Sequence, residues 1–379
     1  MRLAGVGALW GAATLFHAYH DGAARSWQQA LEAAITAVAI APDRAAVHAI
    51  LRGLVVGLAD NHAAVTHPMA LVDGMLPMAF RRFGDRIVVA GTVAQLAGDV
   101  IAGDELIAID DVPARIAYTR AAGVTSAATP GYHELASLVR MSRGPRGAIR
   151  TLVLQRAPGQ TTTRYFPLVS YAAYDHQVLG PRPKTGSEVA PGVYYVDIEE
   201  LTTATWTKLV TGLRSARSVI VDLRGYSASI MAVLASFLTQ EIASPVWCIP
   251  VRPRAAFAGC VKSRWSVRPA ADHLTARLLV LVDAHTTSAM ETALQMIVDH
   301  GLATTLGETS GGTNGNIANV QLPGGFEARF TGMRAERPDG STIHGRGIVP
   351  DVVVHPTLAG LRAGRDEILE AAIARAQAP

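Results

Sequence analysis

The stretch LLVLVDAHTTSAME, residues 278–291, decides the predicted fold, because an apolar run changes there into a short polar turn and then into a helical pattern. The run 278–282 has the composition of a strand buried on both faces, as in a parallel sheet covered by helices. The residues after Ser288 predict a helix from Ala289 to His300. Ser288 therefore stands where a strand gives way to a helix, at the edge of the sheet where α/β proteins bind their ligands.

The same alternation extends toward the N-terminus. Strands are predicted at 192–198 and 218–223, and helices at 206–213 and from about Ile230 to Glu241. Repeated βα units of this kind predict an α/β core with helices on both sides, which we place at residues 171–379. A linker rich in proline lies near the start of this core, with Pro181, Pro183 and Pro191.

Residues 1–75 are rich in Ala and Leu and have helical periodicity, which predicts a small helical domain. Asp43 is placed to start a second helix that runs through Val55. The apolar run from Leu3 to Phe16 fits either an amphipathic first helix or a signal peptide with a short basic start, and we favour the helix.

Residues 76–170 have short β-type runs at 86–90, 105–109 and 150–154, separated by glycines. The segment GDELIAID, residues 103–110, resembles the "GDxIxxIdg" signature of PDZ domains, in which an extended peptide adds to an edge strand. A generic β-hairpin is the alternative. The resemblance implies a PDZ-like β domain inserted between the helical domain and the core.

Composition excludes several classes of protein. Apolar residues make up 49% and charged residues 17% of the 379 residues, which is typical of a globular chain. The net charge of +3 comes with scattered arginines and no basic stripe, which argues against nucleic-acid binding. No apolar run reaches the roughly twenty residues that cross a bilayer. Cys248 and Cys260 are too few for a metal site, and either a disulfide or two buried thiols fits them. No metal or organic cofactor is predicted.

Ser288 has two interpretations when it is considered alone. Serine is among the best helix N-caps, so a structural role is the simpler one. In a nucleophilic role, the free N–H of Ala289 would hold an oxyanion formed on Ser288, with a second donor from Gly225 or Tyr226 at the end of the preceding strand. Gly225 would allow the close approach that a side chain blocks.

A set of short motifs occurs in a fixed order along the chain: LWG at 9–11, FHAY at 16–19, Trp27, LADNH at 58–62, the 103–110 segment, DLRG at 222–225, SAME at 288–291, GET at 307–309 with GG at 311–312, PDG at 338–340 and GRGIVPD at 345–351. In this order they resemble the carboxyl-terminal-processing, or tail-specific, family of serine peptidases, which includes the tricorn core. The resemblance implies a crotonase-like spiral α/β core and makes Ser288 the nucleophile.

The general base is assigned by the same resemblance. Classical members use a Ser/Lys dyad, but this chain has no lysine after Lys262, so that dyad is absent. Members of the tricorn-like branch use a histidine in the "D-x-H" element, and His62 is the matching position. A neutral imidazole can take up the serine proton at ordinary pH. His17, His20 and His67 are less favoured candidates.

The third catalytic group is not assigned. Related enzymes support the histidine with an acid near the "GxGIxPD" segment, where this chain has His344. Asp60, Glu308 and Glu336 are the candidates for an orienting acid. The turn at 226–229 reads YSAS and departs from the family's glycine-rich "NpGG", so the second oxyanion donor is also open. Glu291 is interpreted as a residue that caps its own helical turn.

The predicted function is therefore a serine endopeptidase that forms an acyl-enzyme on Ser288, with His62 as base and the PDZ-like domain holding an extended or C-terminal peptide. The expected partner is a peptide or protein substrate, without nucleic acid or membrane span, and a homo-oligomer is left open. Relatives are often periplasmic or secreted, and a chain without a signal peptide would be cytoplasmic. The alternatives are an inactive peptidase-fold protein that binds a peptide or small hydrophobic ligand and, less favoured, an acyl-CoA enzyme of the crotonase type.

Overall fold

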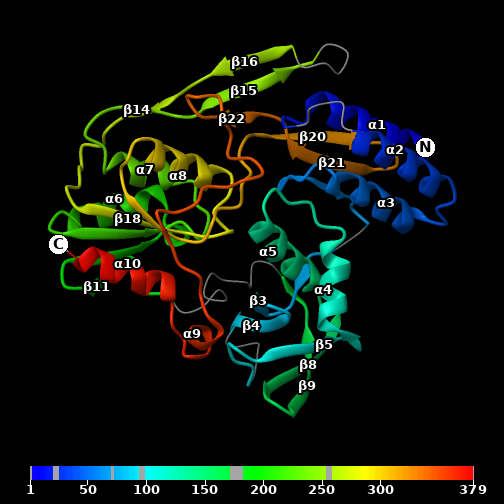
Figure 1. Ribbon diagram of the computed structural model, residues 1–379, viewed down its shortest axis with the longest axis horizontal. Coiled ribbons are helices and arrows are strands. Elements are labelled where there is room, and N and C mark those ends of the chain that lie inside the picture. Colours follow the sequence, from blue (N-terminus) through cyan, green and yellow to red (C-terminus); the bar gives the residue numbers. More distant parts are fainter. Residues whose placement is uncertain are drawn as a thin grey trace.

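The computed structural model describes residues 2–19, 25–69, 72–93, 99–170, 182–252 and 258–378. The elements form three groups that surround a central region: N-terminal helices with a β-hairpin, a middle segment of strands and two helices, and a helix-covered sheet (Figure 1). Among the expected linker prolines, Pro183 and Pro191 belong to the described residues, and Pro181 lies outside them.

The helix-covered sheet has the strand order β11-β12-β13-β18-β19-β23. Its strands are β11 (Glu188–Ala190), β12 (Val193–Asp197), β13 (Ser218–Asp222), β18 (Arg277–Val282), β19 (Thr304–Gly307) and β23 (Val352–Val353). All neighbours from β12 to β23 are parallel, and β11 alone runs antiparallel at the edge. The strands predicted at 192–198, 218–223 and 278–282 are thus confirmed, and the structure has them as parallel strands at Val193–Asp197, Ser218–Asp222 and Arg277–Val282.

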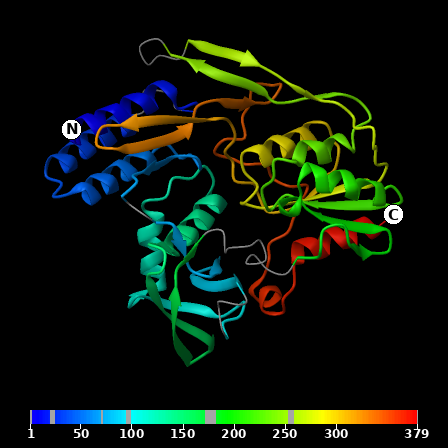
Figure 2. The same ribbon diagram turned by 180° about the vertical axis from the view of Figure 1, so that it is seen from behind.

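Helices cover both faces of this sheet because successive side chains of a strand point to opposite sides. Val219 and Val221 pack in a core with α6 (Thr203–Gly212), α7 (Ile230–Ala235) and α8 (Ala289–Asp299). Ile220 packs in a second core, on the face covered by α10 (Glu367–Gln377). Figure 2 shows these two helical layers from behind, with α10 near the C-terminus of the chain. The 3-10 helix η3 (Ile198–Glu200) and α9 (Leu358–Arg362) complete this group.

The predicted length of α7 is wrong, because the helix ends at Ala235 and not near Glu241. The carbonyl groups of Ala235 and Ser236 accept hydrogen bonds from the N–H groups of Ala270 and Leu274, a segment distant in sequence. The chain then enters β14 (Ile242–Ala243), which pairs with β17 (Ser266–Val267). Tertiary partners therefore end the helix where the local pattern would continue it.

The middle segment comprises the described residues of 72–170. Its sheet has the order β3-β4-β5-β8-β9, and β6 pairs with β5 at the side. The strands are β3 (Met78–Phe83), β4 (Arg86–Thr92), β5 (Glu105–Ile109), β6 (Val112–Pro113), β8 (Ile149–Ala157) and β9 (Gln160–Pro167), so the three predicted β runs are confirmed. Helices α4 (Ala114–Ala122) and α5 (Pro130–Met141) share one apolar core with this sheet. A small sheet of β2 (Gly74–Met75), β7 (Arg143–Gly144) and β10 (Val169–Ser170) joins the ends of the segment.

The described part of the N-terminal group has three helices, one more than expected: α1 (Arg2–Phe16), α2 (Arg25–Ala39) and α3 (Arg44–Val56). Asp43 caps α3 through the Ala46 N–H at 2.8 Å, as predicted. These helices share their core with a hairpin from the last third of the chain, β20 (Ile317–Leu322) and β21 (Phe326–Thr331). Strand β1 (Ala64–Thr66) pairs with β21, which brings the turn before β1 close to Thr331.

A long hairpin of β15 (Val246–Val251) and β16 (Gly259–Ser263) lies across the top of the molecule in Figure 1, and β15 also pairs with β22 (Arg334–Glu336). Cys248 and Cys260 form a disulfide across this hairpin, with their Cα atoms 5.2 Å apart. Of the two arrangements that fit the sequence, the structure has the disulfide. Within the described residues, no helix has the length and apolar character that a bilayer span requires.

Candidate active site

The candidate site lies at the carboxyl ends of β13 and β18, which are adjacent parallel strands with Asp222 opposite Leu281. The Leu223 N–H donates to the Leu281 carbonyl at 3.0 Å. The Thr286 hydroxyl donates to the Leu223 carbonyl at 2.8 Å. The chain after β13 and the turn before Ser288 therefore lie side by side, at the edge of the sheet predicted from the sequence.

Ser288 has a left-handed backbone conformation, with φ 55° and ψ −120°. Such a conformation costs on the order of 1–3 kcal/mol for a residue with a side chain, and it persists only where the surroundings hold it. The Ser288 N–H donates to the Thr313 carbonyl at 2.9 Å. Its side chain makes no capping hydrogen bond to α8 and is only partly buried. The N-cap alternative is therefore not realised by the hydroxyl, which is left for chemistry.

The expected oxyanion donors belong to the two segments that meet at this edge of the sheet. Ala289 is the first residue of α8, so its N–H has no partner within the helix. Gly225 follows β13 in close contact with Glu199: a Cβ at Gly225 would lie 2.9 Å from Glu199 Cβ, which favours glycine at this position. Tyr226, the next residue, has an exposed side chain.

The loop at 308–314 connects the Ser288 turn with the His62 turn. The Gly311 carbonyl accepts from Asn61 Nδ2 at 2.8 Å. The Asn61 N–H donates to Thr313 Oγ1 at 3.2 Å, and Thr313 is the residue whose carbonyl accepts from Ser288. Two segments more than 220 positions apart in the sequence are thus fixed to one loop, and His62 follows Asn61 directly.

The hydrogen bonds of His62 assign its tautomer. Thr331 Oγ1 donates to Asp60 Oδ1 at 2.8 Å, and the same oxygen lies 2.8 Å from His62 Nδ1. A hydroxyl has one proton, so Thr331 accepts from a protonated Nδ1, and the neutral ring keeps its lone pair on Nε2. Burial lowers the pKa of His62, although the charge of Asp60 raises it in part. His62 is therefore a neutral imidazole at neutral pH with Nε2 able to take up a proton.

Asp60 holds this arrangement from a fully buried position. Its Oδ1 accepts from the His62 N–H at 2.9 Å and its Oδ2 from the Thr331 N–H at 2.7 Å. His17 Nε2 lies 3.3 Å from Oδ2. Burial raises the pKa of Asp60, but its hydrogen bond and ion pair with His17, the charge of His62 and the Thr331 N–H together hold this pKa well below its usual range. The carboxylate is thus ionised and can only accept hydrogen bonds.

The other two acids proposed from the sequence have different partners. Glu308 pairs with Arg81 of β3 and with His355, whose Nδ1 lies 3.2 Å from Glu308 Oε1. Glu336 Oε2 accepts from Lys262 Nζ at 3.0 Å beside the disulfide. Of the three acids, Asp60 is the one whose hydrogen bonds reach His62.

The remaining histidines are also placed. His344 stacks on Tyr19 with ring centroids 3.8 Å apart, and burial lowers its pKa to about 4. Its charge interacts with Asp60, His17 and His62, so His344 belongs to the same cluster. His67 contacts the Gly324 carbonyl at 3.2 Å, at the turn of the β20–β21 hairpin. His20 lies outside the described residues.

Asn61 and Thr331 are the residues that the sequence analysis missed. Asn61 had a signal, because it lies inside the quoted LADNH motif. Thr331 had none, because its place beside His62 depends on the pairing of β1 with β21 across the chain.

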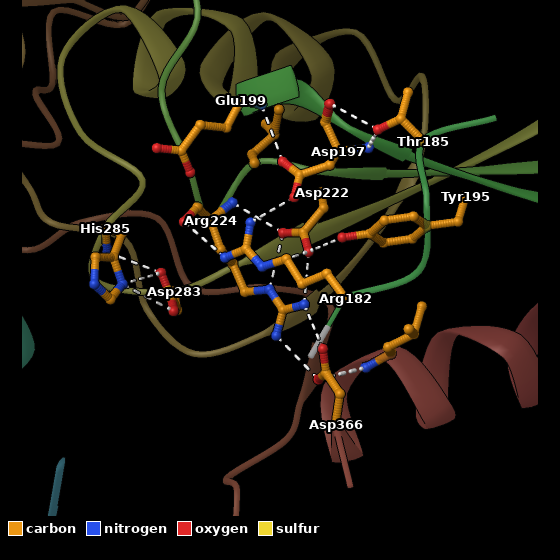
Figure 3. Close-up of polar contacts among 12 residues, drawn as sticks. Arg182, Thr185, Tyr195, Asp197, Glu199, Asp222, Arg224, Asp283, His285 and Asp366 are labelled. Atoms are coloured by element: carbon orange, nitrogen blue, oxygen red, sulfur yellow. Dashed lines mark hydrogen bonds and ion pairs between the residues drawn. The ribbon is translucent and has the colours of Figure 1, made fainter. Parts of the chain in front are cut away.

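A buried network of charges fixes the strand end that carries Gly225 (Figure 3). Asp222 Oδ2 accepts from Arg224 Nη2 at 2.6 Å and from the Tyr195 hydroxyl at 2.8 Å. Arg224 also pairs with Asp366 at 2.6 Å, and Arg182 donates to the Arg224 carbonyl at 3.2 Å. Burial raises the pKa of Asp222, but Arg224 and Arg182 hold it well below its usual range. The backbone around Arg224 is therefore held on both sides.

Among the described residues, one group has side chains close enough to hold a metal: Cys248, Cys260 and Glu336, with ligand atoms within 4.8 Å of one another. The metal ligand of a cysteine is its thiolate, and both sulfurs here belong to the disulfide. As arranged, this group does not offer a metal site.

A serine hydroxyl on a strained turn between strand and helix, on a mixed α/β sheet, is the arrangement of serine hydrolases. Residues 192–354, a little under half of the chain, match the model of peptidase family S41. Over these residues the chain is similar to the S41 peptidases. No curated protein matched the chain in a sequence comparison.

Solved structures match over nearly the whole chain. The structure of mature CPAF complexed with lactacystin has a TM-score of 0.75 at 15% identity, and the match covers 99% of this chain and 97% of that one. The photosystem II D1 C-terminal processing protease has a TM-score of 0.54 at 18% identity, covering 97% and 98%. The tricorn protease has a TM-score of 0.55 at 14% identity, covering 99% of this chain and 36% of that one. At these identities the matches establish a shared fold.

Proposed function

We propose that this chain is a serine endopeptidase that forms an acyl-enzyme on Ser288, with His62 as the general base. The observation that carries this proposal is the loop 308–314, which binds both the Ser288 N–H and the turn that carries His62. It is supported by the tautomer of His62, whose Nε2 is left as an acceptor by the Thr331 hydrogen bond.

The proposed reaction has two stages. Ser288 Oγ attacks the peptide carbonyl carbon and its proton passes to His62 Nε2. The oxyanion is held by the Ala289 N–H and by an N–H of Gly225 or Tyr226. The C–N bond then breaks, and His62 gives its proton to the leaving amine. Water, deprotonated by His62, attacks the ester carbonyl carbon. The ester C–O bond then breaks, the acid product leaves, and His62 returns its proton to Ser288 Oγ.

Asp60 is proposed as the orienting acid, acting through Thr331. The ionised carboxylate takes the Thr331 proton, and this fixes the oxygen to which His62 Nδ1 donates. The negative charge of Asp60 also stabilises the imidazolium that forms during the reaction. Glu308 and Glu336, with partners elsewhere, are assigned no part in it.

The middle segment is proposed to be a PDZ-like domain that engages an extended or C-terminal peptide. The division that goes with this proposal is a helical domain at 1–75, the PDZ-like domain at 76–170 and a crotonase-like spiral core at 171–379. The proposal is supported by a cavity of about 530 Å³ lined by Arg82, Tyr118, Thr129, Pro130, His133 and Glu134. The Thr129 hydroxyl donates to the Gly311 carbonyl at 3.0 Å, so this cavity borders the loop that joins Ser288 and His62.

A fluorophosphonate probe tests the nucleophile. Wild-type protein should become covalently labelled, and the adduct should map to Ser288 by mass spectrometry. Ser288→Ala should lose the label, and the control Ser215→Ala, at an exposed serine, should keep it. Wild-type protein that stays unlabelled at every pH from about 5 to 9, a range that brackets the titration of histidine, would contradict the proposal. Equal labelling of Ser288→Ala would also contradict it.

The second candidate is a peptidase-fold protein that binds a peptide or small hydrophobic ligand without turnover. It is favoured by His344, which stands where the resemblance expects an acid. For this candidate, wild-type protein would stay unlabelled, and binding of an immobilised peptide library would be the same for wild type and Ser288→Ala.

A further inference from the structure

Glu291 is a buried carboxylate that the proposed mechanism does not use. It lies in α8, one helical turn after Ser288, and its side chain is inaccessible to solvent. Its Oε1 accepts from the Ser310 hydroxyl and from the Gly312 N–H at 2.7 Å, and its Oε2 accepts from the Thr313 N–H at 2.9 Å. The carboxylate therefore extends beyond its own helical turn to hold a separate loop.

These hydrogen bonds connect Glu291 to the turn that carries Ser288 through the same loop. Thr313 donates its N–H to Glu291 and accepts the Ser288 N–H on its carbonyl at 2.9 Å. Ser310, the other end of the loop, accepts from the Ile348 N–H at 2.7 Å. The position of Ser288, with its left-handed backbone, thus depends on a loop that Glu291 holds from inside the protein.

The pKa of Glu291 is influenced chiefly by its burial and by the hydrogen bonds around its carboxylate. Burial raises its pKa to about 7, while hydrogen bonds from Ser310, Gly312, Thr313 and the Ser288 backbone lower it in part. Burial is the main cause of the raised pKa of the Tyr19 phenol, and the charge of Glu291 also raises it. A protonated Glu291 would have an O–H in place of one acceptor lone pair, so one of the three groups that donate to it, Ser310, Gly312 or Thr313, would lose its acceptor.

We propose that Glu291 is a positioning residue whose ionised carboxylate holds Gly312 and Thr313 against α8, and thereby keeps Ser288 aligned for attack. Uptake of a proton by Glu291 releases part of the loop and lowers the reactivity of Ser288. The catalytic part of this inference rests on the proposed function, whereas the holding of the loop does not.

The pH dependence of acylation distinguishes Glu291 from His62. The rate of fluorophosphonate labelling in wild type should rise with pH through about 7, as Glu291 loses its proton. If the titration of His62 alone caused this rise, the labelling rate would reach its plateau at a pH below the usual pKa of histidine, because burial lowers the pKa of His62. A wild-type rate that is flat from about pH 6 to pH 8, a window centred on neutrality, would overturn the proposal.

Glu291→Gln is the decisive variant. Glutamine keeps the shape of the side chain but offers one acceptor and places an NH₂ group against N–H donors. The labelling rate should fall roughly tenfold to a hundredfold, as expected from losing a hydrogen bond to a charged group, and the rise near neutral pH should disappear. The matched control Glu32→Gln changes an exposed glutamate of α2 and should keep both the rate and its pH profile. A Glu291→Gln profile that superimposes on wild type would overturn the proposal.

Amide hydrogen exchange of Gly312 and Thr313 in wild-type protein gives a readout that needs neither activity nor a folded variant. After correction for intrinsic rates, protection of both amides should increase as pH rises through about 7. Constant protection would overturn the holding of the loop. Increasing protection in a protein that the probe never labels would reject the peptidase mechanism and retain the role of Glu291 in the fold.

Discussion

At the residue scale, the burial of one side chain, His344, makes the free energy of unfolding depend on pH. The ring packs on Tyr19 inside the cluster around Asp60, and burial lowers its pKa to about 4. An unfolded chain would bind a proton there below about pH 6.5, whereas the folded chain stays neutral. The unfolded state therefore binds more protons between the two values, and the free energy of unfolding falls as pH falls through this window.

His344→Phe keeps an aromatic ring against Tyr19 and removes the titration. When pH falls from neutral to about 4.5, the free energy of unfolding should decrease in both proteins. We expect this decrease to be smaller in the variant than in wild type by up to about 3 kcal/mol, at about 1.4 kcal/mol for each pKa unit. Urea unfolding at both pH values measures the difference. His300→Phe, at an exposed histidine, is the control, and an identical loss in wild type and His344→Phe would contradict this account.

The sequence identified Ser288, His62 and Asp60 as residues worth testing because each lies in a short motif with a recognisable order. It could not reveal that Ser288 has a left-handed backbone or that Glu291 reaches the loop at 310–313. Both features depend on where a loop some twenty positions away returns to α8, and local patterns carry no information about that return.

At the element scale, the pairing of β1 with β21 places Thr331 between Asp60 and His62. Thr331→Val preserves the shape of the side chain and removes the hydroxyl. His62 Nδ1 then loses its acceptor and Asp60 loses a donor, so the fluorophosphonate labelling rate should fall roughly tenfold or more, with about 1–3 kcal/mol lost from stability. Labelling kinetics and urea unfolding measure the two effects.

Thr162→Val, at an exposed position of β9, is the matched control and should change neither quantity. A Thr331→Val enzyme that is acylated at the wild-type rate would show that Thr331 does not orient His62. The Asp60 route to the histidine would then be wrong, while Ser288 could still be the nucleophile.

The helices and strands were largely predictable where the local composition of the chain determines the type of element. The apolar runs at 218–223 and 278–282 became buried parallel strands, because such runs suit a sheet covered on both faces. The end of α7 was not predictable, since the segment 270–274 takes up its last carbonyl groups. The helix α2, between the two expected N-terminal helices, was also missed.

At the scale of the whole molecule, the Asp222 network joins segments that are far apart in the chain. Arg182 precedes the sheet, Arg224 follows β13, and Asp366 caps the C-terminal helix α10. Asp222 is fully buried among them. Asp222→Asn would leave Arg224 and Arg182 with a buried excess of positive charge, so we expect a loss of about 3–5 kcal/mol.

Urea unfolding at neutral pH measures this loss. The control is Asp272→Asn, which removes one partner of the exposed pair with Arg214 and should cost no more than about 1 kcal/mol. Equal effects of the two substitutions would show that the buried network contributes little to the stability of the sheet.

The arrangement of the whole molecule also connects the middle segment to the candidate site. Ser126 Oγ accepts from the Asp60 N–H at 3.0 Å, and the Ala128 N–H donates to Asn61 Oδ1 at 2.8 Å. The Arg81–Glu308 pair forms a second connection beside the loop at 308–314. On the side of the middle segment, Arg81, Ser126 and Ala128 lie outside the quoted motifs, so the sequence predicted the presence of an inserted β segment but not its contact with the His62 turn.

The central claim is that Ser288 is the nucleophile and His62 its base. A crystal structure of the protein with a peptide boronic acid tests both parts in one measurement. The account predicts boron bonded to Ser288 Oγ, His62 Nε2 within about 2.6–3.2 Å of that oxygen, and a boronate oxygen accepting from the Ala289 N–H. An unmodified Ser288, or an imidazole whose Nε2 lies more than about 6 Å away and so beyond any hydrogen bond, would contradict it.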